Sequence, residues 1–267
     1  MIRAEKGTVY LVGAGPGDPE LLTVRALRLL EQADVVFHDD LVPDATLALV
    51  NPRALITSVG KRCGRPRITQ QGIHSLLIES ARAGQSVVRL KSGDPLVFGR
   101  AGEEIAALRA AGIPFVIVPG VTAALAAGAA LELPLTDRNS ASKLIFVTGH
   151  HAEGKDAAPL WSGPLPEDAT LVVYMPGRDT SRLARDLRAA GVAGDVPCCA
   201  ISHAATPQQS HAACRLNGFD ELECGPAPLL MLVGRAMESL LCEASAASAL
   251  GKVVAGPLAA LVERARD

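Results

Sequence analysis

The sequence is poor in aromatic residues, which make up 3% of its 267 positions. Charged residues account for 20% and apolar residues for 49%, so we expect a large core built mainly of Ala, Val and Leu, and global disorder is excluded. The net charge of −2 argues against a general nucleic-acid or membrane surface. We therefore expect neither partner, although a local basic pocket is compatible with this balance.

The chain also lacks cysteine and histidine patterns that are typical of metal sites. Its six cysteines form no CxxC pair, and no histidine lies at zinc-ligand spacing from them. His150-His151 is interpreted as loop polarity rather than as a metal site. A chain of this size needs no disulfide for stability, and its first seven residues contain no apolar signal region. We expect a cytoplasmic protein with reduced thiols and no metal.

No apolar run is long enough to cross a membrane. Residues 110–131 carry no charge, but Pro114 and Pro119-Gly120 interrupt them, and a span needs about 20 unbroken apolar residues. We instead predict a buried strand at 115–118 and an Ala-rich helix at 122–131.

Apolar runs and helical periodicities alternate in the first half, which indicates a parallel α/β sheet covered on both faces. The predicted strands are 8–12, 34–38, 54–59, 85–90 and 115–118, and the predicted helices are 21–30, 69–82 and 103–111.

The second half has strands that follow each other more closely, which predicts a mixed or antiparallel sheet and an α+β domain. The expected strands are 143–148, 169–175, 197–202, 209–215 and 228–234, with helices at 178–190 and 217–223. We predict an N-terminal domain of residues 1–119, a C-terminal domain of residues 120–242, a helical appendage at 243–267 and a long surface loop at 152–168.

A glycine-rich turn, residues 13–17, separates the first strand from the first helix and indicates a nucleotide-like ligand. The turn matches the dinucleotide fingerprint poorly, because the third Gly comes one residue early and Pro16 intervenes. Asp18 and Glu20 also place carboxylates where a pyrophosphate needs bare amides. A positively charged nucleoside would fit this turn better.

A second turn of this kind, Ser92-Gly93-Asp94, follows the strand 85–90. Glycine lets the backbone approach a ligand closely, and Asp94 adds a fixed acceptor. Arg100 precedes an acidic helix start, and turns after strands are where α/β proteins bind ligands.

A basic cluster after Gly60 is predicted to be a loop that attracts a polyanionic small molecule. Its cations are Lys61, Arg62, Arg65 and Arg67.

Several of these segments together resemble the tetrapyrrole methylase family, from about Thr8 to about Met237. They are residues 12–23, Gly60-Lys61-Arg62, residues 93–104, residues 119–123 and Tyr174-Met175. The resemblance implies a two-domain α/β fold, usually a homodimer, with S-adenosylmethionine bound in the cleft between the domains. It also implies transfer of two methyl groups to pyrrole carbons C2 and C7 of uroporphyrinogen III, giving precorrin-2 on the routes to sirohaem and cobalamin.

The same resemblance implies roles for particular residues. Asp39 matches a proton acceptor, Lys61 a proton donor, and Arg100 and Glu103 a pair that acts at the substrate. The eight carboxylates of the substrate would pair with Lys61, Arg62, Arg65, Arg67 and Arg100. The implied cofactor contacts are Pro16, Ser92, Gly93, Asp94, Val97, Thr122, Ala123, Met175 and Ala204. Ser92, His38 and Ala204 depart from the usual residues of the family.

Three alternatives stay open from the sequence. One is a methylase acting on a later corrin precursor. Another is a nicotinamide oxidoreductase that uses the Gly13-Ala14-Gly15 turn, and the third is a regulator that binds the cofactor without catalysis.

Overall fold

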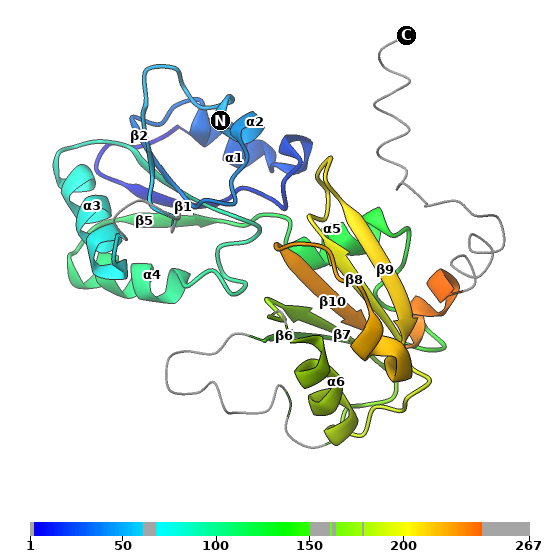
Figure 1. Cartoon of the computed structure of the whole chain (residues 1–267). Coiled ribbons are helices and arrows are strands. Elements are labelled where there is room, and N and C mark those ends of the chain that lie inside the picture. The colour runs from blue at the N-terminus through cyan, green and yellow to red at the C-terminus, as the bar shows by residue number, and fades with distance from the viewer. Residues whose placement is uncertain (1–2, 61–67, 150–160, 162–163, 178, 242–267) are drawn as a thin grey trace, which may run out of the picture. The chain divides into compact units, whose positions relative to one another are not determined.

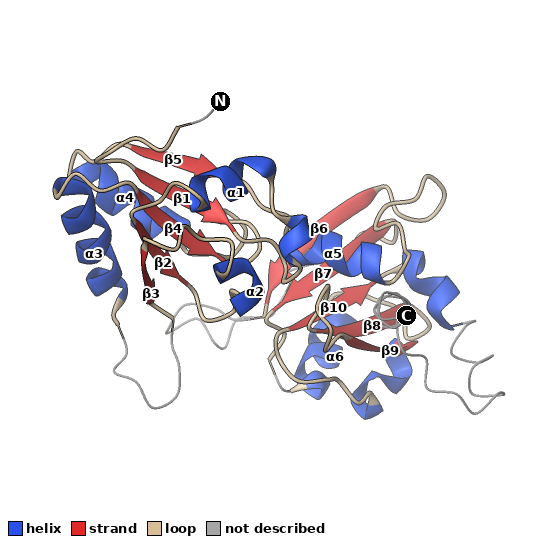
Figure 2. Cartoon of the chain, turned by 90° about the horizontal axis from the view of Figure 1, so that it is seen from above, coloured by secondary structure: helices blue, strands red, loops and turns tan. Residues whose placement is uncertain are grey.

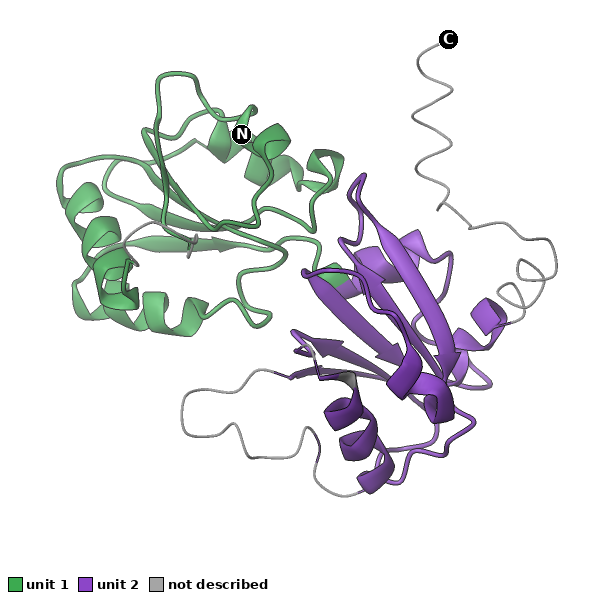
Figure 3. Ribbon diagram, viewed as in Figure 1, with its two compact units in different colours: residues 1–123 green, residues 124–267 purple. Residues whose placement is uncertain are grey.

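The structure is a computed structural model that describes residues 3–60, 68–149, 161, 164–177 and 179–241 (Figure 1). The chain divides into two compact units, Met1–Ala123 and Ala124–Asp267, which Figure 3 shows in two colours. The predicted boundary before residue 120 stays a prediction, and the appendage at 243–267 lies outside the described residues. Within the described parts, no helix combines the length and the apolar character that a membrane span requires.

The first unit contains a five-stranded sheet in the order β3-β2-β4-β1-β5, and every pairing in it is parallel. Its strands are β1 (Val9–Gly13), β2 (Val35–His38), β3 (Leu55–Ser58), β4 (Val87–Lys91) and β5 (Phe115–Val118). Its helices are the 3₁₀ turn η1 (Pro19–Leu21), α1 (Val24–Leu30), α2 (Asp44–Leu47), α3 (Gln70–Arg82) and α4 (Ala101–Ala110). The predicted parallel α/β architecture is confirmed.

Both faces of this sheet are covered, because side chains alternate along a strand. Val9 and Leu11 pack in a core cluster with residues of α3 and α4. Tyr10 and Val12 face the other way and pack with residues of α1. Figure 2 shows the sheet of this unit together with α1, α3 and α4. A strand that is buried on both faces must be apolar throughout, which explains the continuous apolar runs.

The second unit has a mixed five-stranded sheet in the order β6-β7-β10-β8-β9, as predicted. β6 pairs with β7 in parallel, and the other pairings are antiparallel. The strands are β6 (Lys143–Thr148), β7 (Ala169–Tyr174), β8 (Pro197–Ser202), β9 (Ser210–Arg215) and β10 (Leu229–Val233). The helices are α5 (Ala123–Ala130), which begins at the last residue of the first unit, α6 (Thr180–Ala189), η2 (Leu216–Glu221) and η3 (Arg235–Met237).

Several predicted elements begin or end one or two residues from where the structure places them, and three differences go further. The first helix begins at Val24 rather than Leu21, because the Thr23 hydroxyl caps it by accepting from the Ala26 N–H at 3.1 Å. α2 was not predicted, and four residues after Pro43 are too few to show a helical period. The short helix predicted at 217–223 is a 3₁₀ helix shifted to Leu216–Glu221.

Asp34 joins the amino ends of β2 and β4. Its carboxylate accepts from the Ser86 N–H at 2.7 Å, from the Ser86 hydroxyl at 2.8 Å and from Lys6 Nζ at 2.7 Å. The hydrogen bond from Lys6, followed by the one from the Ser86 backbone, lowers the pKa of Asp34 from 3.8 to about 2.

We predict that Asp34→Asn lowers the free energy of unfolding at pH 7 by about 1–2 kcal/mol. The folded pKa lies below the unfolded value, so this contribution is present above pH 3.8 and is lost as the pH falls through about 2. Urea unfolding at pH 7 and pH 3 measures it, with Glu79→Gln on the exposed side of α3 as the control. A penalty that is independent of pH would contradict the assignment.

Candidate active site

The carboxyl ends of β1 and β4 form a topological switch point. The two strands are neighbours, but the chain leaving β1 continues to β2 beyond β4, whereas the chain leaving β4 continues to β5 beyond β1. The helices that follow them, α1 and α4, pack on opposite faces of the sheet. Open α/β sheets bind ligands at such a point. Both predicted glycine turns lie there.

Hydrogen bonds join these two turns directly. The Gly93 N–H donates to the Gly15 carbonyl at 2.7 Å, and the Gly15 N–H donates to the Gly93 carbonyl at 3.2 Å. Gly15 and Gly93 both have positive φ, of 74° and 66°. These are backbone conformations that glycine adopts without strain.

The loop after β5 meets the same two turns. A Cβ on Gly13 would lie 2.6 Å from the Gly120 Cα and 2.7 Å from the Gly93 carbonyl oxygen. A Cβ on Gly120 would lie 2.3 Å from that same oxygen. The backbones after three strands therefore touch, and side chains are excluded at positions 13 and 120.

Asp94 ties these loops together. Its Oδ1 accepts from the Leu96 N–H at 2.8 Å, and its Oδ2 accepts from the Gly120 N–H at 2.9 Å. A carboxylate has about four lone-pair sites, so this anchoring leaves capacity for a ligand. Thr122 and Ala123 are close by, since their Cα and N atoms lie 3.8 and 3.9 Å from where a Cβ on Gly93 would be.

A buried ionic cluster lies at the end of β4 and was missed by the sequence reasoning. Arg89 binds the carboxylates of Asp39 and Glu104, and Lys91 Nζ lies 3.1 Å from Glu104 Oε1. Arg89 and Lys91 are each 2% exposed and Glu104 is fully buried. The sequence did contain a sign of it, because Arg89 and Lys91 lie two residues apart at the end of a predicted strand and therefore on the same face of the sheet.

The charges in this cluster compensate each other. Burial alone would lower the pKa of Arg89, but the charges of Asp39 and Glu104 outweigh burial and raise it. Burial and then the nearby Arg89 charge lower the pKa of Lys91 below its ordinary value.

Arg100 and Glu103 form the pair that the sequence predicted to act together. Arg100 Nε donates to Glu103 Oε1 at 2.7 Å, and Nη2 donates to Oε2 at 2.8 Å. This bond lowers the pKa of Glu103 and raises that of Arg100. The Arg100 side chain is 54% exposed, and its backbone is left-handed at φ 56° where it precedes α4. A guanidinium in this position is accessible to an anionic ligand.

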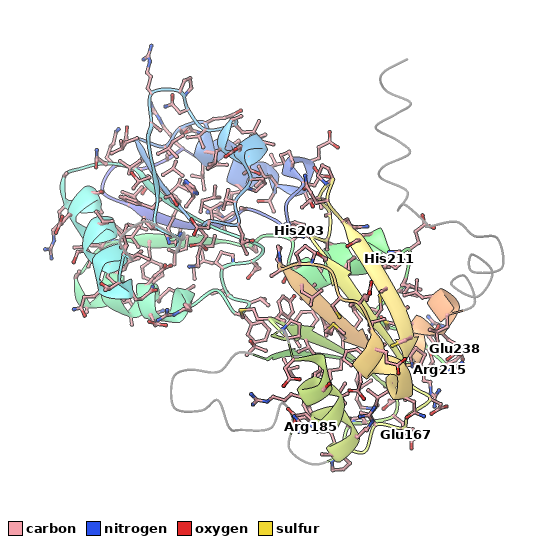
Figure 4. All side chains as sticks on the ribbon, in the orientation of Figure 1. Glu167, Arg185, His203, His211, Arg215 and Glu238 are labelled. Carbon is pink, nitrogen blue, oxygen red and sulfur yellow. The ribbon has the colours of Figure 1, made fainter. Side chains whose placement is uncertain are left out.

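The other predicted residues fall into three groups. Pro16, Ser92 and Val97 lie in the turns after β1 and β4, and Asp39 directly follows β2. Met175 and Ala204 belong to the second unit and follow β7 and β8, which end at the same edge of their sheet because both are antiparallel to β10. His203, labelled in Figure 4, directly precedes Ala204. Lys61, Arg62, Arg65 and Arg67 lie outside the described residues, as does His150-His151.

Metal binding has no candidate among the described residues, where no three His, Cys, Asp or Glu side chains are grouped to hold an ion. The four described cysteines are free. Burial raises the pKa of Cys199 to about 12, which makes this thiol unreactive.

The fold and the site define a two-unit α/β protein with glycine turns that are suited to a nucleotide-like ligand. The family model "Tetrapyrrole (Corrin/Porphyrin) Methylases" matches residues 8–220, and the chain belongs to this family. The family resemblance predicted from the sequence is thus confirmed.

Individual relatives extend this finding. The chain is 43% identical over 235 residues to a uroporphyrinogen-III C-methyltransferase of Paracoccus denitrificans, covering 87% of this chain and 82% of the relative. It is 49% identical over 206 residues to a siroheme synthase of Acinetobacter baylyi, covering 77% of this chain but only 45% of that protein. The chain thus spans about half the length of this longer relative.

A solved structure is similar as well. It is a uroporphyrin-III C-methyltransferase of Thermus thermophilus complexed with S-adenosylhomocysteine. Its identity is 39% and its TM-score 0.72, over 87% of this chain and 94% of that one. The predicted two-part fold, a parallel sheet followed by a mixed one, is confirmed.

We predict that Gly13→Ala lowers the free energy of unfolding by about 1–3 kcal/mol, because the added methyl collides with backbone that cannot move independently. Urea unfolding measures the change. Gly102→Ala is the matched control, since a Cβ there meets no atom within 4 Å. Equal stability of the two variants would contradict the close contact of the three loops.

Proposed function

We propose that this protein is an S-adenosylmethionine-dependent methyltransferase that methylates C2 and C7 of uroporphyrinogen III to give precorrin-2. The observation that carries the proposal is the meeting of the glycine backbones 13, 93 and 120 beside the carboxylate of Asp94. The names of the family and of the similar proteins support the reaction and the substrate.

The residues of the first unit suit this cofactor. S-adenosylmethionine carries an ammonium, a sulfonium and ribose hydroxyls but no phosphate, and supplies an electrophilic methyl group when bound. Leaving aside the two neighbours of Gly93 in the chain, the atoms within 4 Å of a Cβ placed there are backbone atoms of Thr122 and Ala123, so this side of the turn presents backbone. Asp18 and Asp94 would repel a pyrophosphate but can accept hydrogen bonds from the cationic and hydroxyl groups of this ligand.

We assign the cofactor contacts to the residues that the family resemblance implied. In the first unit they are Pro16, Ser92, Gly93, Asp94, Val97, Thr122 and Ala123. In the second unit they are Met175 and Ala204. Their common role is to orient the methyl group, since positioning supplies most of the rate in such a transfer.

The charges near the site suit the substrate and its chemistry. Arg100 is an exposed cation that can bind a carboxylate of the substrate, and Lys61, Arg62, Arg65 and Arg67 would add to it. Methylation makes the pyrrole ring positive, and a proton then leaves it. Asp39 or Glu103 can stabilise that charge or take the proton, with Lys61 as the proton donor.

We further propose a homodimer in the cytoplasm, which static light scattering and cell fractionation test. The family resemblance supports the homodimer, and the free cysteines of the described residues are typical of the cytoplasm.

The proposed reaction is tested by incubation with S-adenosylmethionine and freshly generated uroporphyrinogen III, followed by mass spectrometry. We expect a gain of two methyl groups. If the protein binds S-adenosylmethionine but adds no methyl group to uroporphyrinogen III, the proposed substrate is wrong and a later corrin precursor takes its place. Binding of NADH instead of S-adenosylmethionine would identify a nicotinamide enzyme.

We predict that Arg100→Ala reduces turnover by about 100-fold or more while S-adenosylmethionine still binds, because the substrate loses a charged partner. Steady-state kinetics and calorimetry measure the two quantities. Arg109→Ala on the same helix is the control, since this guanidinium stacks on the Phe115 ring at 5.6 Å instead. Turnover at the wild-type rate in Arg100→Ala would refute the role.

We also predict that Asp94→Ala weakens S-adenosylmethionine binding about tenfold or more, because the Leu96 and Gly120 amides lose their acceptor. Calorimetry measures the affinity. Asp137→Ala is the matched control, because this carboxylate likewise accepts from two backbone amides, those of Asn139 and Ser140, in the second unit. Unchanged affinity in Asp94→Ala would exclude the predicted contact.

A further inference from the structure

The guanidinium of Arg89 connects two carboxylates that lie on different elements. Nε donates to Glu104 Oε1 at 3.0 Å, and Nη2 donates to Asp39 Oδ1. Nη1 donates to the carbonyl oxygens of Phe37 at 3.4 Å and Leu90 at 3.2 Å. All three nitrogens are therefore engaged. Since a guanidinium is a rigid planar fork, the position of one carboxylate fixes that of the other.

Glu104 is the buried end of this chain of contacts. It belongs to the first turn of α4 and is 0% exposed. Its Oε1 accepts from both Arg89 and Lys91, whereas its Oε2 has no hydrogen-bond partner among the described residues. A buried carboxylate with one unpartnered oxygen costs stability, and such costs are typical of functional sites.

Asp39 is the accessible end. Its side chain is 32% exposed, whereas those of Arg89 and Glu104 are 3% and 0% exposed. Asp39 directly follows β2, and the contact with Arg89 holds its side chain. The buried Glu104 carboxylate thus holds Arg89, and Arg89 in turn holds the partly exposed Asp39 carboxylate.

We propose that Glu104 is a positioning residue, which holds the Asp39 carboxylate in its reactive orientation through the Arg89 guanidinium. Lys91 Nζ lies 3.1 Å from Glu104 Oε1 and offsets the charge of that carboxylate, and the charge of Asp39 acts on Lys91 as well. The importance of Asp39 orientation for turnover rests on the proposed function above.

The test uses Glu104→Gln, which keeps the shape of the side chain but removes its charge. We expect kcat per folded molecule to fall about tenfold or more, whereas the dissociation constant of S-adenosylmethionine changes less than about twofold. Glu79→Gln, an exposed carboxylate on α3, is the matched control and should leave both values unchanged. A fall of kcat and affinity together, or an unchanged kcat, would overturn the proposal.

A second variant guards against misfolding of the first. Arg89→Lys keeps the positive charge, but a single ammonium cannot bind both carboxylates and both carbonyls as the planar fork does. We again expect kcat to fall while the dissociation constant of S-adenosylmethionine stays nearly unchanged. Wild-type kcat in Arg89→Lys would contradict the proposal.

An unfolding cycle tests the link without any assay of activity. Urea midpoints are measured for Glu104→Gln, Asp39→Asn and the double variant. Because the two carboxylates do not bind each other directly, coupling through Arg89 predicts midpoint shifts that are not additive. Additive shifts would overturn the link. If the wild-type protein transfers no methyl group, the proposed function is wrong. The urea midpoints of the three variants then still decide whether Glu104 is linked to Asp39.

Discussion

Direct contact between the glycine backbones at positions 13, 93 and 120 is the constraint on which the site depends. Parallel strands bring their carboxyl ends to one edge, but side chains would normally keep the following loops apart. Here a Cβ at position 13 or 120 would lie within 2.8 Å of neighbouring backbone, so only glycine permits the approach. Asp94 then locks the arrangement by accepting from the Gly120 amide. The result is a sheet edge made of backbone groups, to which we assign the cofactor.

The buried ionic cluster behind this edge is the second determinant. Isolated charges are costly to bury, and a pair is tolerated only when its hydrogen bonds are satisfied. Arg89 meets that condition with four acceptors, whereas Glu104 meets it with one oxygen only. In proteins generally, replacing a buried ion pair by apolar residues of similar volume is often neutral or even stabilising. The charges are therefore better explained by what they do to Asp39 than by their contribution to the fold.

The sequence predicted those helices and strands that are marked by a pattern of neighbouring residues. Residues 115–118 and 197–202 are strands as predicted, because their apolar runs are bounded by Pro and Gly or by polar residues. The start of the first helix was wrong because a side-chain cap at Thr23 decided it, and α2 was missed for lack of length. Arg89 was overlooked within an apolar run, since its partners Asp39 and Glu104 are 50 and 15 residues away. The roles of Lys61 and the cations up to Arg67 stay predictions.

The central claim is that the glycine turns at the carboxyl edge of the first sheet hold the cofactor. It is tested most directly by backbone amide NMR during titration with S-adenosylhomocysteine. The account predicts large shift changes for Gly15, Gly93 and Gly120, and small ones for Gly7 and Ser86 at the opposite edge. Binding that leaves the three glycine amides unchanged, while others shift, would contradict it.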